Sequence, residues 1–290
     1  MRIVSFLKDG NSVLGVRDGD EVVDLSIAAP TLPTELTELL TKGPSALATA
    51  GACVRYASKE ARLPAQKLKL LPPTRKASKV ICLGLNYIDH AAESGLQRPD
   101  YPVVFLRTPT SLVACCEAIV RPNCSEKLDY EGELVAIIGR RAHNIERAKA
   151  LSFVAGYSVF NDASIRDFQL RTSQWTVGKN FDRTGAFGPD FVTADEVPPG
   201  AVGLRIETRL NGAVVQSATT SDMIFGVAET VALLSECMTL EPGDVLVMGT
   251  PAGVGLARTP PLWMKPGDIC EVEIEKIGVL RSYVEQEDSV

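Results

Sequence analysis

The sequence predicts a mixed α+β fold that is rich in β-structure, with a small N-terminal α/β domain ahead of a larger second domain. Short apolar runs are separated by turns containing glycine or proline along most of the chain. Helical spacing is confined to a few stretches, of which residues 221–239 are the longest. A doubly wound sheet, in which strands and helices alternate regularly, does not fit this pattern.

The first 25 residues predict a β-meander followed by a helix. Apolar segments at 2–7, 12–17 and 21–25 are separated by K-D-G-N and D-G-D, and Asp-Gly between apolar strands is a strong hairpin signal. Residues 34–40 have helical spacing, and Gly43-Pro44 is expected to end that helix.

A proline-rich polar stretch at 71–76 predicts a linker between two domains. We therefore place a small N-terminal domain at residues 1–71 and the main domain at 72–290. Within the main domain, Pro-Gly-Asp occurs at 242–244 and again at 266–268, each time before an apolar run. Pro-Gly suits the two central positions of a type II turn, so a strand is expected after each turn.

Composition excludes several classes of protein. The chain has 290 residues, is 45% hydrophobic and 23% charged, and carries a formal net charge of −6, which gives no electrostatic basis for binding nucleic acid or an anionic membrane. No apolar run approaches the length of a membrane span, and the N-terminus does not resemble a signal peptide. Seven cysteines without C-x-x-C spacing predict reduced thiols in a cytoplasmic protein, no zinc site and no cysteine needed for catalysis.

The stretch L-D-Y-E-G-E-L-V-A-I-I-G at 128–139 combines a strand pattern with three acids. Side chains alternate along a strand, so Asp129, Glu131 and Glu133 are expected on one face, just before an apolar run. One interpretation is a solvent-facing edge strand that carries charge against aggregation. The other is a site where a cation neutralises the acids.

A second strand supports the cation site. Residues 156–162 have a strand pattern that ends at Asn161-Asp162. Carboxylates at the ends of two strands are the oxygen ligands that Mg²⁺ prefers, with water or substrate oxygens completing its coordination. Both interpretations remain open on these residues alone.

His90 and Glu93 are candidates for acid–base chemistry. The spacing i, i+3 places them side by side on one helical turn, where the carboxylate could orient the imidazole as a general base. An exposed helix-surface pair would have the same spacing. Gly84 and Gly95 flank this segment, so we expect residues 86–95 to form a lid that is mobile without ligand. The other histidine, His143, lies in a polar stretch and is expected at the surface.

Two further motifs could complete a site. Lys179, in Q-W-T-V-G-K, is either a surface lysine or a group that stabilises an oxyanion. The glycine-rich turn at 248–255 lacks the spacing of nucleotide-binding loops. Its backbone N–H groups and the Thr250 hydroxyl could instead hold a small carboxylate.

Taken in order, these motifs resemble the fumarylacetoacetate hydrolase family. The resemblance covers roughly residues 72–282 and rests on the following motifs: G-L-N-Y-x-D-H-x-x-E, D-Y-E-G-E-L, G-Y-x-V-x-N-D-x-S-x-R-D-x-Q, W-x-x-G-K-x-F-D and L-x-P-G-D-V-x-x-x-G-T-P-x-G-V-G. It implies a β-rich roll or sandwich, Mg²⁺ or Mn²⁺ as cofactor and a homodimer. Arg107 and Ser282 stand where members of the family often have lysine and asparagine.

The resemblance also implies a role for each candidate residue. The metal ligands are Glu131, Glu133 and Asp162; the water-activating pair is His90 and Glu93; Lys179 is the active-site lysine; Arg166, Gln169 and Thr250 lie near the substrate carboxylate or oxyanion. Asp129 is not a ligand in the family, so we expect it to support the site rather than to bind the metal.

The activity expected from this resemblance is metal-dependent hydrolysis of a C–C bond in a 1,3-dicarbonyl acid, such as an acylpyruvate, fumarylpyruvate or diketo acid. Two alternatives remain. The same site could decarboxylate or tautomerise oxaloacetate or a related 2-keto acid, because these reactions share an enolate. A non-catalytic β-module with a structural metal is the other alternative, although such a module would need neither Lys179 nor the His90–Glu93 pair.

Overall fold

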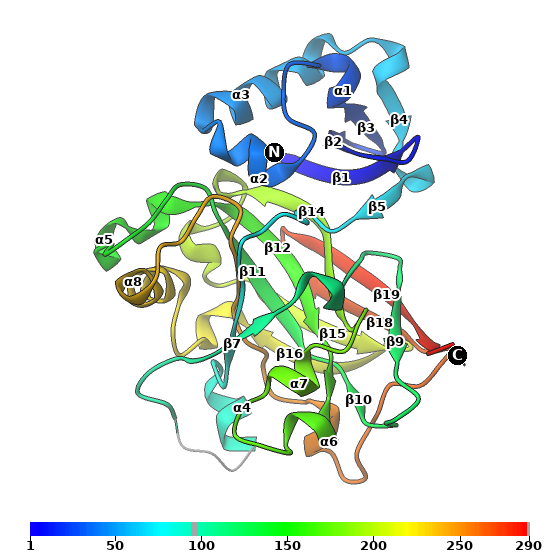
Figure 1. Ribbon diagram of the computed structural model, residues 1–290, viewed down its shortest axis with the longest axis vertical. Coiled ribbons are helices and arrows are strands. Elements are labelled where there is room, and N and C mark those ends of the chain that lie inside the picture. Colours follow the sequence, from blue (N-terminus) through cyan, green and yellow to red (C-terminus); the bar gives the residue numbers. More distant parts are fainter. Residues whose placement is uncertain (94–97, 289–290) are drawn as a thin grey trace.

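The computed structural model describes residues 1–93 and 98–288 and consists of two large β-sheets, a two-stranded ladder and helices around them (Figure 1). The N-terminal residues form the upper part in Figure 1, and the remaining strands and helices form the larger lower part. The predicted β-rich mixed fold is confirmed.

The larger sheet contains twelve strands within the described residues. Ten of them follow in the order β4 (Arg62–Pro64), β3 (Glu21–Asp24), β2 (Asn11–Asp18), β1 (Arg2–Lys8), β14 (Gly185–Thr193), β12 (Val154–Asp162), β11 (Gly132–Ile138), β17 (Val245–Val247), β6 (Val80–Gly84) and β7 (Val103–Arg107). β5 (Lys69–Leu71) pairs with β1, and β8 (Leu112–Ala114) pairs with β14.

The predicted N-terminal meander is confirmed as β1, β2 and β3, which pair in succession. β1 also pairs with β14, where Arg2 lies opposite Val192 and Ile3 opposite Phe191. The N-terminal strands and the main-domain strands therefore form one continuous hydrogen-bonded sheet, although the sequence of residues 71–76 predicts a linker between two domains.

Two N-terminal helices cover one face of this sheet. α2 (Leu36–Thr41) lies where sequence predicts a helix, and α3 (Pro44–Cys53) follows it. α3 is not predicted from the sequence, where Gly43-Pro44 indicates only the end of a helix. Gly43 has a φ of +82°, its N–H bonds the Leu40 carbonyl, and Pro44 occupies the first turn of α3, so the dipeptide ends one helix and begins the next.

A second sheet packs against the other face and makes the fold a sandwich. It contains β16 (Ala213–Thr219), β15 (Arg205–Leu210), β18 (Ile269–Ile274), β19 (Gly278–Gln286) and β9 (Ala118–Arg121), in that order. β18 and β19 contact β12, and the largest apolar core lies between the sheets, with Leu134, Val159 and Val272 among its fully buried members. This burial stabilises the frame on which the polar residues are held.

The predicted Pro-Gly turns are confirmed. Gly243 and Gly267 have φ values of +86° and +92°, as the third position of a type II turn requires. The N–H of Asp244 bonds the Glu241 carbonyl at 3.0 Å and closes the first turn, after which β17 begins.

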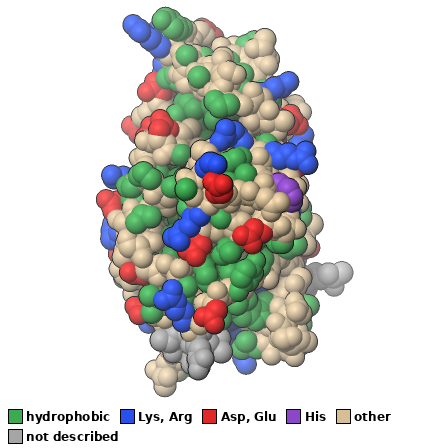
Figure 2. All heavy atoms as spheres, turned by 90° about the vertical axis from the view of Figure 1, so that its left-hand side faces the viewer, with side chains coloured by type: hydrophobic (Ala, Val, Ile, Leu, Met, Phe, Trp, Pro, Cys, Tyr) green, Lys and Arg blue, Asp and Glu red, His purple; other side chains and the backbone are tan. Residues whose placement is uncertain are grey.

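The remaining helices are short. They are α1 (Leu25–Ala28), α4 (Ile88–Glu93), α5 (Arg147–Ala150), α6 (Arg166–Gln169), α7 (Thr176–Lys179) and α8 (Val227–Cys237). A two-stranded ladder joins β10 (Leu128–Asp129) to β13 (Ser164–Ile165). Acidic and basic side chains are interspersed over the face shown in Figure 2. No helix of residues 1–93 and 98–288 is both long and apolar enough to cross a membrane.

Candidate active site

The acid-rich stretch lies in the centre of the larger sheet. β11 pairs with β12 on one side and β17 on the other, and all seven of its residues are buried. The interpretation as a solvent-facing edge strand is therefore wrong. The stretch is also not one continuous strand: β10 ends at Asp129, Tyr130 and Glu131 lie between, and β11 begins at Gly132.

The register of β11 and β12 brings Glu131, Glu133 and Asp162 together. Gly132 lies opposite Asn161, and the Asp162 N–H donates to the Glu131 carbonyl at 2.8 Å, so these two acids face each other. Glu133 lies two residues further along and shares the face of Glu131. One carboxylate oxygen from each of the three acids lies within 4.8 Å of the others, and all three are buried.

Lys179 lies against two of these acids. Its Nζ is 2.6 Å from Glu131 Oε2 and 2.7 Å from Asp162 Oδ2, and its side chain is 2% exposed, which excludes the surface interpretation. Burial opposes the charged form, but the charges of Asp162 and Glu131 outweigh it and raise the pKa of Lys179 above its usual value. The residue is therefore an ammonium at the centre of the acids.

Two arginines complete the inner charge network. Arg166, at the start of α6, bonds Glu131 at 2.7 Å and Asp129 at 2.8 Å. Arg107, at the end of β7, donates from Nε to Asp162 Oδ1 and from Nη2 to the Ala163 carbonyl. Asp129 accepts from Arg166 and supports the site, as the resemblance implies, and it is not part of the three-acid cluster.

Glu133 remains the least compensated acid. Among the described residues no cation forms an ion pair with it, and the Gly249 N–H donates to its Oε2. Burial raises the pKa of the Glu133 carboxyl well above its usual value, and the charges of Asp162 and Glu131 add to the rise. A divalent cation would relieve this repulsion, and three carboxylates in reach of one point are a suitable donor set for Mg²⁺ or Mn²⁺.

The glycine-rich turn after β17 binds the protein's own acids. Its N–H groups at Gly249, Gly253 and Gly255 donate to Glu133, Glu93 and Asp129, respectively. The Thr250 hydroxyl donates to the Gly132 carbonyl at 3.0 Å and accepts from Gln216 at 2.8 Å. The turn therefore holds the acidic cluster in place from one side.

Helix α4 places Glu93 beside the same turn. Glu93 Oε2 accepts from the Gly253 N–H at 2.8 Å, and the side chain lines the cavity described below. His90 lies in α4, but the position of its ring is outside the part of the structure that is described, as are residues 94–97, including Gly95 of the predicted lid. The His90–Glu93 pair and the mobile lid therefore stay predictions.

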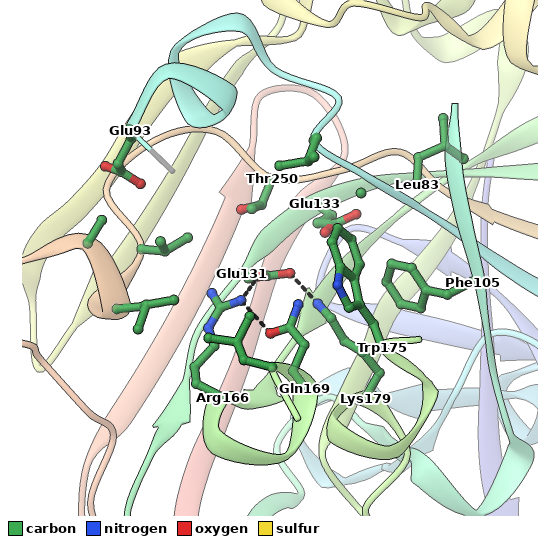
Figure 3. A pocket seen from close by; sticks show the side chains of 16 residues that line it. Leu83, Glu93, Phe105, Glu131, Glu133, Arg166, Gln169, Trp175, Lys179 and Thr250 are labelled. Atoms are coloured by element: carbon green, nitrogen blue, oxygen red, sulfur yellow. Dashed lines mark hydrogen bonds and ion pairs between the residues drawn. The ribbon is translucent and has the colours of Figure 1, made fainter. Parts of the chain in front are cut away.

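These groups open into a cavity of about 430 Å³ (Figure 3). At one end lie Glu131, Glu133, Arg166, Gln169, Lys179 and Thr250. The walls are apolar and include Leu83, Phe105, Leu170, Trp175, Val254 and Leu256. Glu93 lies across the cavity from Lys179 and Trp175 in Figure 3. The arrangement can hold a small anion by its charged end and a carbon chain against its walls.

Arg166, which lines this cavity, has one side-chain nitrogen without a hydrogen-bond partner among the described residues. Its Nη1 donates to Gln169 Oε1 at 2.9 Å, and Nη2 is buried without a hydrogen-bond partner among the described residues. An unpaired buried guanidinium donor is costly, so this nitrogen is a candidate to bind a ligand oxygen. A substrate carboxylate matches that donor.

Three residues at the site, Arg107, Trp175 and Gln216, are not among the site residues that the sequence predicts. Arg107, which stands where members of the family often have lysine, is buried against Asp162. A signal for it existed, because Arg107 shares a face of β7 with buried Phe105. Gln216 bonds both Thr250 and the Gly132 N–H. Trp175 packs over Gly84, where a Cβ would lie 2.0 Å from the indole.

Comparisons with known proteins show the family to which the chain belongs. The family model for the fumarylacetoacetate hydrolase C-terminal region matches residues 79–285. The mitochondrial oxaloacetate tautomerase Fahd2a of Rattus norvegicus is 37% identical over 285 residues, which cover 97% of this chain and 90% of the relative.

Solved structures of fumarylacetoacetate hydrolase relatives have the same fold as this chain. A fumarylacetoacetate hydrolase from Exiguobacterium antarcticum superposes with a TM-score of 0.87 at 35% identity, covering 99% of this chain and 100% of that one. A maleylpyruvate hydrolase from Sphingobium, in complex with manganese(II) and pyruvate, gives a TM-score of 0.83 at 25% identity, with coverage of 99% and 100%. By sequence and by structure, this chain belongs to the fumarylacetoacetate hydrolase family.

Proposed function

We propose that the chain is a divalent-metal-dependent enzyme that interconverts the keto and enol forms of a small 2-oxo acid of the oxaloacetate type. The observation that carries the proposal is the buried Lys179 ammonium, placed between Glu131 and Asp162 in the same cavity as the unpaired donor of Arg166. The similarity to an oxaloacetate tautomerase over nearly the whole chain supports this reaction over the hydrolysis expected from sequence.

Substrate binding is assigned to the charged end of the cavity. Arg166 Nη2 binds the carboxylate beside the keto group, and Gln169 holds the guanidinium in position through Nη1. Glu131, Glu133 and Asp162 would hold Mg²⁺ or Mn²⁺, which polarises a carbonyl and stabilises negative charge on its oxygen when bound. The charged groups at this end are buried, so their interactions are stronger than they would be in water.

Proton movement is assigned to the chain's own residues on two sides of the substrate. Tautomerisation moves a proton between the carbon next to the keto group and the carbonyl oxygen. Lys179 Nζ donates to that oxygen as its charge develops. We assign removal and return of the carbon-bound proton to His90 and Glu93 of α4, which lies across the cavity.

Hydrolysis of a C–C bond is the second candidate, and a specific feature favours it. Beyond the charged end, Leu83, Phe105 and Trp175 form an apolar wall, and the two aromatic rings pack edge to face at 5.8 Å. An acyl group would fit this wall, and a structural relative is a maleylpyruvate hydrolase. Hydrolysis would also require His90 or Glu93 to activate water.

A two-substrate assay separates the candidates. Purified protein with Mg²⁺ or Mn²⁺ is mixed with enol-oxaloacetate and, separately, with acylpyruvates, and loss of enol absorbance is followed while the products are identified. The proposal expects faster ketonisation of oxaloacetate without loss of carbon and little acylpyruvate cleavage. Cleavage of acylpyruvates with no effect on oxaloacetate would replace the proposal with the hydrolase.

We also propose a homodimer, as the resemblance implies. Val104 and Leu106 of β7, Val177 of α7 and Leu170 next to α6 are large apolar side chains that are at least 37% exposed. α7 contacts both β7 and α6, so these side chains lie in one region. Sedimentation of the wild type and of Leu106→Asp tests the assembly: a monomeric wild type would contradict it.

A further inference from the structure

Two adjacent cysteines form the tip of a tight turn away from the three-acid cluster. Cys115 and Cys116 connect β8 to β9, and the Glu117 N–H donates to the Ala114 carbonyl at 3.2 Å, which closes a four-residue turn around them. Cys116 has a φ of +65°, and its N–H donates to the Arg281 carbonyl at 2.7 Å. The turn is therefore fixed to β19 of the second sheet.

The two thiols differ in exposure but lie in contact. The two Sγ atoms are 3.7 Å apart. Cys115 is 6% exposed, and its Sγ lies 3.9 Å from the Val279 carbonyl, whereas Cys116 is exposed to solvent. One sulfur is thus open to a reagent in solution, and the other is held behind it.

The charges around the pair favour a thiolate on the exposed sulfur. The hydrogen bond from the Cys115 thiol lowers the pKa of the Cys116 thiol below its usual value, and the Arg281 guanidinium adds to the effect. The hydrogen bond between the two thiols raises the pKa of Cys115, and burial and the charge of Asp190 act in the same direction. The Glu117 carboxylate accepts from the Ala114 N–H, and Arg281 lies 4.0 Å from Glu271.

We propose that the Cys115–Cys116 turn is a reversible oxidation site, in which Cys116 reacts with a hydroperoxide and Cys115 then closes a disulfide with it. The pair has the arrangement of a reactive thiol with a second thiol ready to condense with its oxidised form. None of these groups lines the cavity of the candidate active site, so the inference is independent of the proposed activity.

The reaction balances with hydrogen peroxide as the oxidant. The Cys116 thiolate attacks one peroxide oxygen, the O–O bond breaks, and the released hydroxide takes up a proton and leaves as water. The Cys115 thiol then loses its proton, its sulfur attacks the Cys116 sulfur, and the S–O bond breaks to release a second water. The two thiols are oxidised by two electrons, and peroxide is reduced.

The disulfide is expected to be easily reduced. The two sulfurs must approach from 3.7 Å to about 2.05 Å, which neighbouring residues reach only with strain. Strained disulfides have higher reduction potentials, so a small thiol or dithiol in solution regenerates both cysteines. The site therefore cycles rather than becoming a permanent cross-link.

Mass spectrometry of the full-length protein tests the site, with the exposed Cys124 as the internal comparison. The reduced protein is treated with hydrogen peroxide at neutral pH, alkylated and digested. Cys116 is expected to react at least about tenfold faster than Cys124, because its thiolate fraction is larger. The peptide containing both cysteines should lose two hydrogen atoms and regain them with dithiothreitol.

Matched variants separate the roles of the residues. In Cys115→Ser, oxidation should stop at a sulfenic acid on Cys116, which dimedone traps. Cys124→Ser should form the disulfide as the wild type does. Arg281→Gln should slow oxidation of Cys116, and Arg281→Lys, which keeps the charge, should restore it. Thermal unfolding of each variant verifies that it is folded. Oxidation of Cys116 no faster than Cys124, or to a sulfinic acid with Cys115 still free, would overturn the proposal.

Discussion

Lys179 carries its charge in a place where burial opposes it. The ammonium is stable there because Glu131 and Asp162 lie within 2.7 Å, and those acids in turn depend on Lys179, Arg166 and Arg107. A buried ion pair of this kind contributes little net stability compared with a variant in which every partner is replaced by an apolar residue. Removing one partner alone is costly, since the remaining charges stay buried.

Lys179→Met should therefore destabilise the metal-free protein strongly. With chelator at neutral pH, we expect the free energy of unfolding to fall by about 3–5 kcal/mol, the usual cost of breaking a buried ion pair. Added Mg²⁺ should recover part of the loss by restoring positive charge. Urea denaturation measures both effects. Lys149→Met, which breaks a solvent-exposed pair with Glu146, is the control and should leave the free energy of unfolding almost unchanged. Equal losses would contradict this account of Lys179.

Glu133 gives the metal-free protein a characteristic pH dependence. Burial and the neighbouring acids raise its pKa in the folded state above the unfolded value. The protonated form therefore favours folding, and this contribution is present below the usual glutamate pKa and is lost as pH rises through the raised value. Glu133→Gln should make stability in chelator less dependent on pH in that window, as measured by urea unfolding at several pH values. If the free energy of unfolding of the wild type and of Glu133→Gln changed with pH in parallel, Glu133 would not be the cause of the pH dependence.

At the scale of elements, Glu93 attaches the end of helix α4 to the turn after β17, because its carboxylate accepts from the Gly253 N–H. Glu93→Gln can still accept that hydrogen bond, so it removes charge while it keeps the attachment. We expect His90→Ala and Glu93→Gln each to lower kcat by roughly a hundredfold, the usual scale for a positioned general base. Metal affinity should barely change.

The double variant shows whether His90 and Glu93 act together. If Glu93 acts through the imidazole, the double variant should lose no more than the larger of the two single losses. Steady-state kinetics of the four proteins gives the answer. Losses that multiply would mean that the two residues act separately and that α4 carries no dyad.

Elements that depend on short-range sequence patterns could be predicted from the sequence, and elements that depend on distant contacts could not. The meander, α2 and the two Pro-Gly turns follow from near-neighbour patterns and were predicted. α3 was missed because Gly43-Pro44 serves two helices at once. The break between β10 and β11 could not be predicted from the sequence, since it depends on the pairing of Asp129 with β13.

At the scale of the whole molecule, the site depends on pairings between distant segments. Glu131 and Asp162 meet because of the β11–β12 register, and Lys179 and Arg107 reach them from α7 and β7. The pattern of residues within one segment does not specify which residues of two strands lie opposite each other. The sequence therefore identifies the three acids as candidates, and the family resemblance implies that they form one metal site. The contact between Arg107 and Asp162 could not be predicted from local patterns because it spans 55 positions of the chain.

The central claim is that Glu131, Glu133 and Asp162 hold one divalent cation on which catalysis depends. It is tested most directly by measuring Mn²⁺ binding, from the electron paramagnetic resonance signal of the free ion, and oxaloacetate ketonisation on the same samples. We expect activity to rise in parallel with one bound Mn²⁺ per chain, and both to be lost in Glu131→Ala, Glu133→Ala and Asp162→Ala. Full turnover in chelated wild-type enzyme, or in a variant that binds no Mn²⁺, would contradict the claim.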